Sequence, residues 1–342
     1  MSLITPFAIL GGLQLKNYYL TGTLGNLWGE ILFLRLTFSN AVFLTFLVVV
    51  LIVEPSLWKL SVSLTILKMS ESWSELCQMR WQKKNQLLRA SASLAGRYLV
   101  SITICAYFLL YDSEFAIYSV LAFVGVFFSV LDTFLDPFQL KEGARSWPTF
   151  KTVLNLSISS LFTALLINLP RYLLKNYNGD ASLGIFTALF YFYVIPAMLI
   201  NIGLQGVGHR LSLLLEKGLI KIGSLVILMC SLVMFSALHF YGELIMMKLY
   251  SITVSWTFFH TLLLTASFFF GSLTTLMQFS LYGLNIYHVQ LKASLLAFLV
   301  AAVSGFWLVP HYAVLGAFLS FLLGLMTQFS LFTFSYMTKK HG

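Results

Sequence analysis

Lys68 lies deep within an apolar stretch, and the residues that follow it suggest a binding site. Glu71 and Glu75 come three and seven residues later, so a helix would place all three side chains on one face. A charge at the centre of a bilayer costs about 2.5–3.5 kcal/mol, so such groups face a partner or a wet cavity. The spacing leaves two interpretations: a local Lys68–Glu71 ion pair, or a charged face lining a polar cavity.

Two arginines, Arg35 and Arg97, lie a few residues inside the neighbouring apolar stretches. Each could extend its side chain to the lipid headgroups. Alternatively, both could face the same half of one cavity as Lys68. Guanidinium and ammonium groups in a pocket of low dielectric constant are well suited to bind a phosphate or diphosphate. The three cations therefore form a candidate anion-binding site.

Prolines and the missing motifs complete the list of chemical signals. Pro196 lies within an apolar run and predicts a kink, and Pro170 predicts the end of another run beside Arg171. Interrupted helices accompany binding sites in transporters, although passive kinks also occur. No catalytic motif is recognisable, and the histidines and cysteines do not have metal-ligand spacing. We therefore expect no catalytic residue, no metal and no cofactor.

The composition predicts an all-α integral membrane protein. Of 342 residues, 59% are hydrophobic and only 10% are charged, with a mean hydropathy of +0.87. A soluble domain has about 25% charged residues, so a soluble enzyme, a disordered chain and a nucleic-acid-binding domain are excluded. The apolar runs are too long for barrel strands. We expect eleven transmembrane helices, at 1–15, 31–53, 57–76, 91–111, 115–135, 152–173, 184–207, 220–241, 257–282, 290–309 and 313–336.

The basic residues predict how these helices are oriented. Alternating the segments places fourteen Lys and Arg residues in one set of loops and four in the other. The positive-inside rule then predicts a multi-pass protein with a cytoplasmic C-terminus. A stretch rich in Pro, Gly and charge at 136–148 separates five segments from six, and the linker is placed at 141–151. We therefore expect two helical lobes, 1–140 and 152–342, joined by this cytoplasmic linker around a central cavity.

Three stretches resemble the oligosaccharide flippases of the MOP superfamily, the Wzx-like polysaccharide biosynthesis group related to the MATE and MurJ transporters. QLKNYYLTG at 14–22, with Arg35 after it, resembles a cytoplasmic turn of the family. The run at 67–99 resembles its fourth helix, basic loop and fifth helix, including a Lys-x-x-Glu pattern. INLPRYLLKNYNGDASLGIFTALFYF at 167–192 is the most specific match. Family members usually have twelve helices, so this chain is expected to lack the first and part of the second.

The resemblance implies a function and a set of partners. It implies alternating-access translocation of an undecaprenyl-diphosphate-linked oligosaccharide across the bacterial cytoplasmic membrane, by a monomer surrounded by membrane lipids. Arg35, Lys68 and Arg97 would bind the diphosphate, and Arg171 would stabilise the outer gate. The carboxylates of Glu71 and Glu75 would modulate the charge or carry a coupled proton.

Three other functions remain as alternatives. A MATE-like antiporter of small cations would require acidic groups to dominate the cavity, whereas the charge within the spans is mainly basic. A membrane-embedded polysaccharide polymerase would be expected to have a large external loop, and every predicted external loop is short. A non-transporting remnant is the third alternative, because the first helix is expected to be missing.

Overall fold

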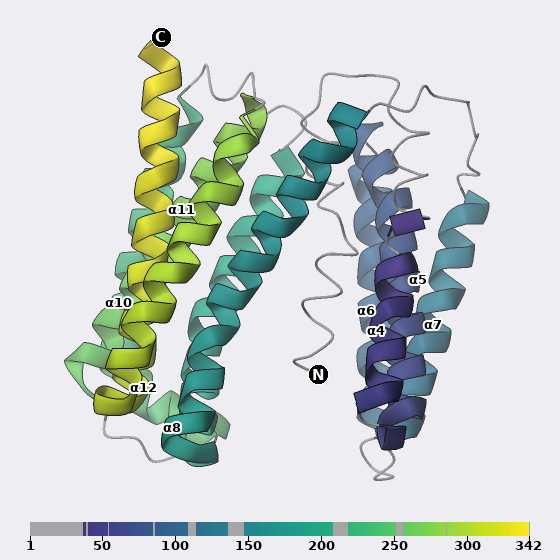
Figure 1. The fold of residues 1–342 in the computed structure, drawn as a ribbon, viewed down its shortest axis with the longest axis horizontal. Helices are drawn as coiled ribbons and strands as arrows, with labels where there is room; N and C mark the ends of the chain where they lie inside the picture. Colours follow the sequence, from purple (N-terminus) through teal and green to yellow (C-terminus); the bar gives the residue numbers. More distant parts are fainter. Residues whose placement is uncertain are drawn as a thin grey trace. The chain divides into compact units, whose positions relative to one another are not determined.

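The computed structural model divides into two compact units of helices (Figure 1). Unit 1 is Met1–Ser157 and unit 2 is Ile158–Gly342, and each is described by itself. The structure describes residues 37–38, 40–53, 55–84, 86–108, 114–135, 147–207, 218–250, 256–284 and 286–341. Across these ranges the backbone forms helices and turns and no strand, in agreement with the all-α prediction.

Unit 1 contains four α-helices within the described residues. They are α4 (Asn40–Val53), α5 (Trp58–Lys83), α6 (Leu87–Phe108) and α7 (Glu114–Leu135). A short 3-10 turn, η2 (Pro55–Leu57), connects α4 to α5. The most extensive packing in this unit is that of α5 against α7. The contact between α5 and α7 is therefore the main packing interface of unit 1.

Small and hydroxyl-bearing side chains hold α5 against α7. Ser129 Oγ donates a hydrogen bond to the Ser70 carbonyl oxygen at 2.7 Å and lies 3.1 Å from Ser74 Oγ. Trp73 Nε1 donates to Thr133 Oγ1 at 2.8 Å along the same contact. Membrane helices associate through such contacts because lipid provides no hydrophobic driving force between them. The many serines of α5 therefore serve helix packing.

Unit 2 is built from four long helices around an aromatic core. They are α8 (Trp147–Val207), which begins in unit 1, α10 (Leu219–Tyr250), α11 (Phe258–Gly283) and α12 (His288–His341). The core includes Phe186, Phe190, Tyr193, Phe318 and Phe321. The ring centres of Phe186 and Phe318 lie 4.6 Å apart, a distance typical of a favourable aromatic pair. These rings join α8 to α12.

The reversal of the chain within α8 occurs at Gly179. The guanidinium carbon of Arg171 lies 5.0 Å from the ring centre of Phe190, whereas a continuous helix would separate these residues by about 28 Å. The non-helical residue between them is Gly179, with φ of 77°. Glycine adopts this left-handed conformation readily because it has no Cβ atom. The two halves of α8 therefore pack as a hairpin (Figure 1).

The segment end predicted at Pro170 is wrong, because Pro170 lies inside a helical part of α8. Pro196 also lies inside the helix, and the kink predicted there stays a prediction. In lipid, an open turn would leave backbone groups without hydrogen-bond partners, so membrane helices continue through prolines. The linker predicted at 141–151 ends inside α8, because the helix already begins at Trp147. The boundary between the units follows Ser157, within the same helix. The two-lobe division at the linker and the central cavity stay predictions.

The structure shows fewer helices than the eleven predicted crossings. The described residues form eight α-helices, four of which contain stretches long and apolar enough to cross a membrane. These stretches are Lys151–Leu204, Ile220–Lys248, Phe258–Gly283 and His288–Thr338. Both α8 and α12 hold two of the predicted segments, because one non-helical residue joins the halves of each helix. Predicted segment 1–15 lies outside the described residues.

Gly316 follows Ala313, the non-helical residue that joins the two halves of α12. A Cβ at Gly316 would lie 3.1 Å from the Val309 nitrogen and closer still to the Leu308 carbonyl, backbone atoms that cannot rotate away. We expect Gly316→Ala to lower the free energy of unfolding by about 1–3 kcal/mol, measured by thermal unfolding in detergent. In the control Gly184→Ala, the new Cβ meets nothing within 4 Å, so we expect no loss of stability. Equal destabilisation by both variants would contradict the prediction.

Candidate functional site

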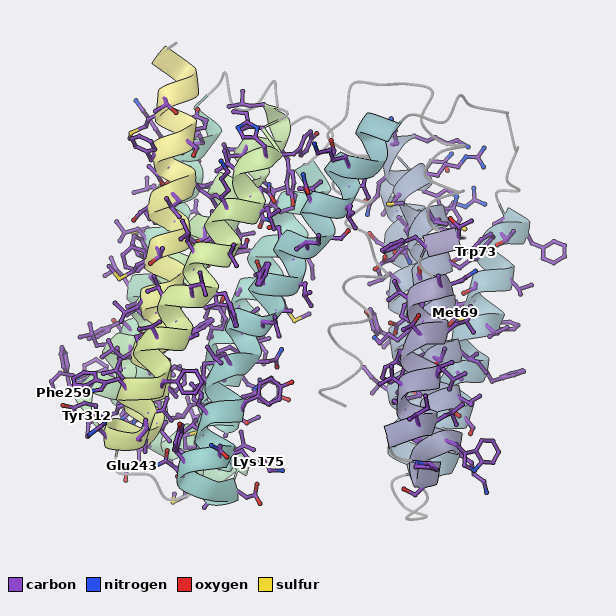
Figure 2. All side chains as sticks on the ribbon, in the orientation of Figure 1. Met69, Trp73, Lys175, Glu243, Phe259 and Tyr312 are labelled. Atoms are coloured by element: carbon purple, nitrogen blue, oxygen red, sulfur yellow. The ribbon has the colours of Figure 1, made fainter. Side chains whose placement is uncertain are left out.

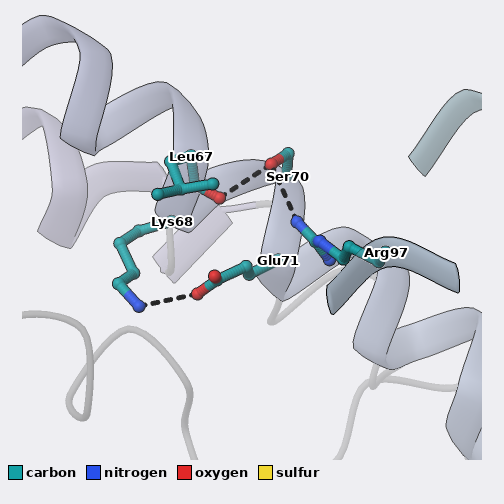
Figure 3. Close-up of polar contacts among 5 residues, drawn as sticks. All are labelled: Leu67, Lys68, Ser70, Glu71 and Arg97. Carbon is teal, nitrogen blue, oxygen red and sulfur yellow. Dashed lines mark hydrogen bonds and ion pairs between the residues drawn. The ribbon is translucent and has the colours of Figure 1, made fainter. Parts of the chain in front are cut away.

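The predicted local ion pair of α5 is present (Figure 3). Lys68 Nζ lies 2.7 Å from Glu71 Oε2, and 33% of each side chain is exposed. The pair requires no other element, because residues three apart on a helix are neighbours on its surface. Glu75, one turn further, is exposed. The ion-pair interpretation is therefore confirmed, and the binding role of Lys68 and the charge-modulating roles of Glu71 and Glu75 stay predictions.

Arg97 is buried between three helices of unit 1. Its side chain is only 7% exposed, and Nη2 donates a hydrogen bond to Ser70 Oγ on α5 at 3.2 Å (Figure 3). Gly125 on α7 leaves room for the guanidinium, since a Cβ there would lie 3.1 Å from Nη2. The Arg97 guanidinium thus makes its contacts inside the protein. The alternative that it extends to the lipid headgroups is wrong.

Asp132 on α7 is a site residue that the sequence predictions omit. Its side chain is 1% exposed and accepts a hydrogen bond from Ser93 Oγ at 2.8 Å. Arg97 and Arg89 of α6 attract this carboxylate electrostatically. The available signal was a carboxylate inside predicted segment 115–135, since ionisable residues at membrane depth are usually functional.

Cations and carboxylates balance in this part of unit 1. Lys68, Glu71, Arg97 and Asp132, which we call the charge cluster, comprise two of each sign. Within this cluster the two signs are equal in number, and Arg35, the third predicted cation, lies outside the described residues. An anion that competes for the Lys68 ammonium group would displace Glu71 from it. No group of His, Cys, Asp and Glu in the described ranges could hold a metal ion.

Arg171, the remaining predicted site residue, belongs to unit 2. Its Nη1 donates a hydrogen bond to Asn168 Oδ1 at 3.2 Å, and its guanidinium lies over the Phe190 ring. The Nε atom is buried and makes no hydrogen bond. An aromatic face attracts a cation through its quadrupole, which accounts for this position. The role of Arg171 at an outer gate stays a prediction.

An apolar groove lies between α5 and α7 in unit 1. Its volume is about 740 Å³, within the range of ligand-binding pockets. We call it the α5–α7 groove, and its lining residues are Ile66, Met69, Ser70, Trp73, Val126, Ser129, Val130, Thr133 and Phe134. Figure 2 labels Met69 and Trp73 on α5. The sequence did not predict this groove, because it depends on which faces of the two helices meet.

The comparisons with known proteins identify the fold. No family model and no curated protein matches this sequence. An outward-facing multidrug resistance MATE family transporter of the MOP superfamily has a TM-score of 0.71 and 14% identity, covering 99% of this chain and 84% of that chain. MATE in the bent conformation has a TM-score of 0.74 and 12% identity, covering 99% of this chain and 84% of that chain. MATE in the straight conformation has a TM-score of 0.71 and 13% identity, covering 100% of this chain and 85% of that chain.

These similarities define the class of fold. The chain is an all-helical, multi-pass membrane protein whose fold is similar to that of the MATE structures. Among the residues that the structure describes, the charge cluster and the α5–α7 groove are the features of unit 1 that could bind a ligand.

Proposed function

We propose that this protein translocates an undecaprenyl-diphosphate-linked oligosaccharide across the bacterial cytoplasmic membrane by alternating access. The observation that carries the proposal is Lys68, a cation in the middle of α5 whose side chain is one third exposed although Glu71 pairs with it. The MATE-like fold supports a transporter. An incoming diphosphate would compete with Glu71 for the ammonium group, which is the chemistry that an anion carrier requires.

The proposed cycle involves no covalent step. Lys68 and Arg97, with Arg35, bind the diphosphate, and Arg171 stabilises the outer gate. Glu71 and Glu75 modulate the charge or carry a coupled proton. Transport then needs only that the substrate bind two conformations with different affinity. We further propose that the protein acts as a monomer in contact with membrane lipids, with its C-terminus in the cytoplasm.

Variants of the ion pair test the binding role. Lys68→Ala is expected to slow transport of a fluorescent undecaprenyl-diphosphate oligosaccharide in proteoliposomes by about 10- to 100-fold, the value of one charge-assisted hydrogen bond. Exchanging the charges, with Lys68→Glu and Glu71→Lys, keeps the ion pair but moves the cation, so we expect it not to restore transport. Lys175→Ala is the control. The Lys175 side chain is 68% exposed and its Nζ lies 4.0 Å from Asp180 Oδ1, and such a surface ion pair contributes little to stability.

Two results would contradict the binding role of Lys68. One is normal transport by Lys68→Ala at a normal protein level. The other is full recovery in the charge-exchanged variant, which would show that the ion pair only stabilises helix packing. A loss of transport in the Lys175→Ala control would instead indicate a general effect of surface charge.

A MATE-like antiporter of small cations is the second candidate. The buried Asp132 favours it, since this carboxylate brings the charge cluster to balance. The same proteoliposomes, given a cationic dye and a proton or sodium gradient, distinguish the two functions. Gradient-driven dye transport that is lost in Asp132→Asn and kept in Lys68→Ala would favour the antiporter.

A further inference from the structure

The lining of the α5–α7 groove is suited to a hydrocarbon chain. Its hydroxyl groups are already engaged, since Ser70 Oγ donates to the Leu67 carbonyl at 2.7 Å and Ser129 Oγ donates to the Ser70 carbonyl. Thr133 Oγ1 accepts from Trp73 and donates to the Ser129 carbonyl at 2.8 Å. The remaining lining side chains are apolar. A ligand that needed hydrogen bonds would therefore lose them on entering this groove.

Apolar side chains of the groove are exposed along its length. Val130 is 50% exposed and Phe134 is 81% exposed, and Ile66 and Val126 are also exposed. Such side chains are stable in a membrane helix because they contact hydrocarbon instead of water. Where the groove faces lipid, these exposed side chains would contact acyl chains.

One end of the groove carries an arginine. Thr133 and Phe134 line this end, and Leu135 directly follows them as the last residue of α7. Arg89 Nη2 donates a hydrogen bond to the Leu135 carbonyl at 2.6 Å, and its guanidinium lies 4.8 Å from the centre of the Trp81 ring. A guanidinium has five N–H donors, so this position leaves others for a phosphate group.

The same end is strongly basic. The segment 79–89, which connects α5 to α6, contains Arg80, Lys83, Lys84 and Arg89 and no carboxylate. Asp132 of α7 attracts Arg89 electrostatically. The positive-inside rule places this end at the cytoplasmic face. Basic sites between helices on that face bind the headgroups of anionic lipids.

We propose that the α5–α7 groove binds an acyl chain of an anionic phospholipid, whose phosphate group contacts Arg89. The apolar lining receives the chain, and the basic segment 79–89 selects the charge of the headgroup. This lipid binds beside the transported substrate and is independent of its identity. Its expected effect is to hold α5, α6 and α7 together at the cytoplasmic face.

Trp73 provides a direct reporter because it lines the groove. The full chain is reconstituted in vesicles containing phosphatidylglycerol or phosphatidylcholine with brominated acyl chains, which quench tryptophan on contact. The difference in emission between the unsubstituted chain and Trp73→Phe isolates the Trp73 signal. We expect phosphatidylglycerol to quench this signal with about fivefold higher apparent affinity, as one basic group near an anionic lipid predicts.

Matched variants separate the headgroup contact from the chain contact. In Arg89→Gln we expect both lipids to quench Trp73 with equal apparent affinity. In Arg89→Lys we expect phosphatidylglycerol to remain the preferred lipid. Val130→Phe adds bulk at a half-exposed position and is expected to reduce quenching by both lipids. Trp58, which is 50% exposed at the other end of α5, is the control, and we expect both lipids to quench it equally.

Two results would overturn the proposal. One is equal quenching of Trp73 by both lipids in the unsubstituted chain, which would remove the headgroup site. The other is quenching that neither Arg89→Gln nor Val130→Phe changes, which would place the lipid elsewhere. Retained preference in Arg89→Lys shows that the effect of Arg89→Gln comes from charge and not from misfolding.

Discussion

Asp132→Leu is expected to lower the free energy of unfolding by about 1–3 kcal/mol, because it removes the acceptor of the Ser93 hydrogen bond and the carboxylate that attracts the buried guanidinium of Arg97. Asp132 is 1% exposed and is attracted by Arg97, which is 7% exposed. Without the carboxylate, the guanidinium keeps the Ser70 hydroxyl as its hydrogen-bond acceptor. The measurement is denaturant unfolding of the full chain in detergent micelles.

A double-mutant cycle isolates the contribution of this pair. Arg97→Leu together with Asp132→Leu removes both charges, so we expect it to recover most of the lost stability. Asp180→Asn is the control, since the Asp180 side chain is 82% exposed. We expect this substitution to change the free energy of unfolding by no more than about 0.5 kcal/mol. If Asp132→Leu were no more destabilising than this control, Asp132 and Arg97 would not interact as the structure indicates.

The double variant, although stable, is expected to transport the lipid-linked oligosaccharide at least about tenfold more slowly, because a charge-assisted contact with the diphosphate is lost. Its recovered stability makes this comparison independent of folding. Transport is measured in the same proteoliposomes as for Lys68→Ala, at equal protein density. Undiminished transport would mean that Arg97 and Asp132 only support helix packing, and the diphosphate site would then have to lie elsewhere.

The helical class and the positions of several helices followed directly from hydropathy. Predicted segment 257–282 corresponds to α11 (Phe258–Gly283), and segment 115–135 corresponds to α7. The end of segment 152–173 did not follow, because the helix continues past Pro170 as far as Gly179. Proline disrupts a helix strongly in water, whereas a lipid environment favours keeping the backbone hydrogen bonds that remain.

The site was predictable in part. The contact between Lys68 and Glu71 depends only on their spacing, and the structure contains it. The position of Arg97 depends on Ser70 and Gly125, which come from two other helices. Spacing within one helix carries no information about such partners. Asp132 was overlooked for a different reason, since its position inside a predicted span could have been read from the sequence.

The sequence alone determined that this chain is a helical membrane protein and that Lys68 has a carboxylate one turn away, because hydropathy and helical spacing act over short distances along the chain. Only the tertiary structure decided that Arg97 lies against Ser70, that Asp132 accepts a hydrogen bond from Ser93, and that a groove opens between α5 and α7. These features arise where Ser70, Gly125 and Ser129 let three helices approach closely. Which helix faces meet is set by the packing of residues far apart in the chain.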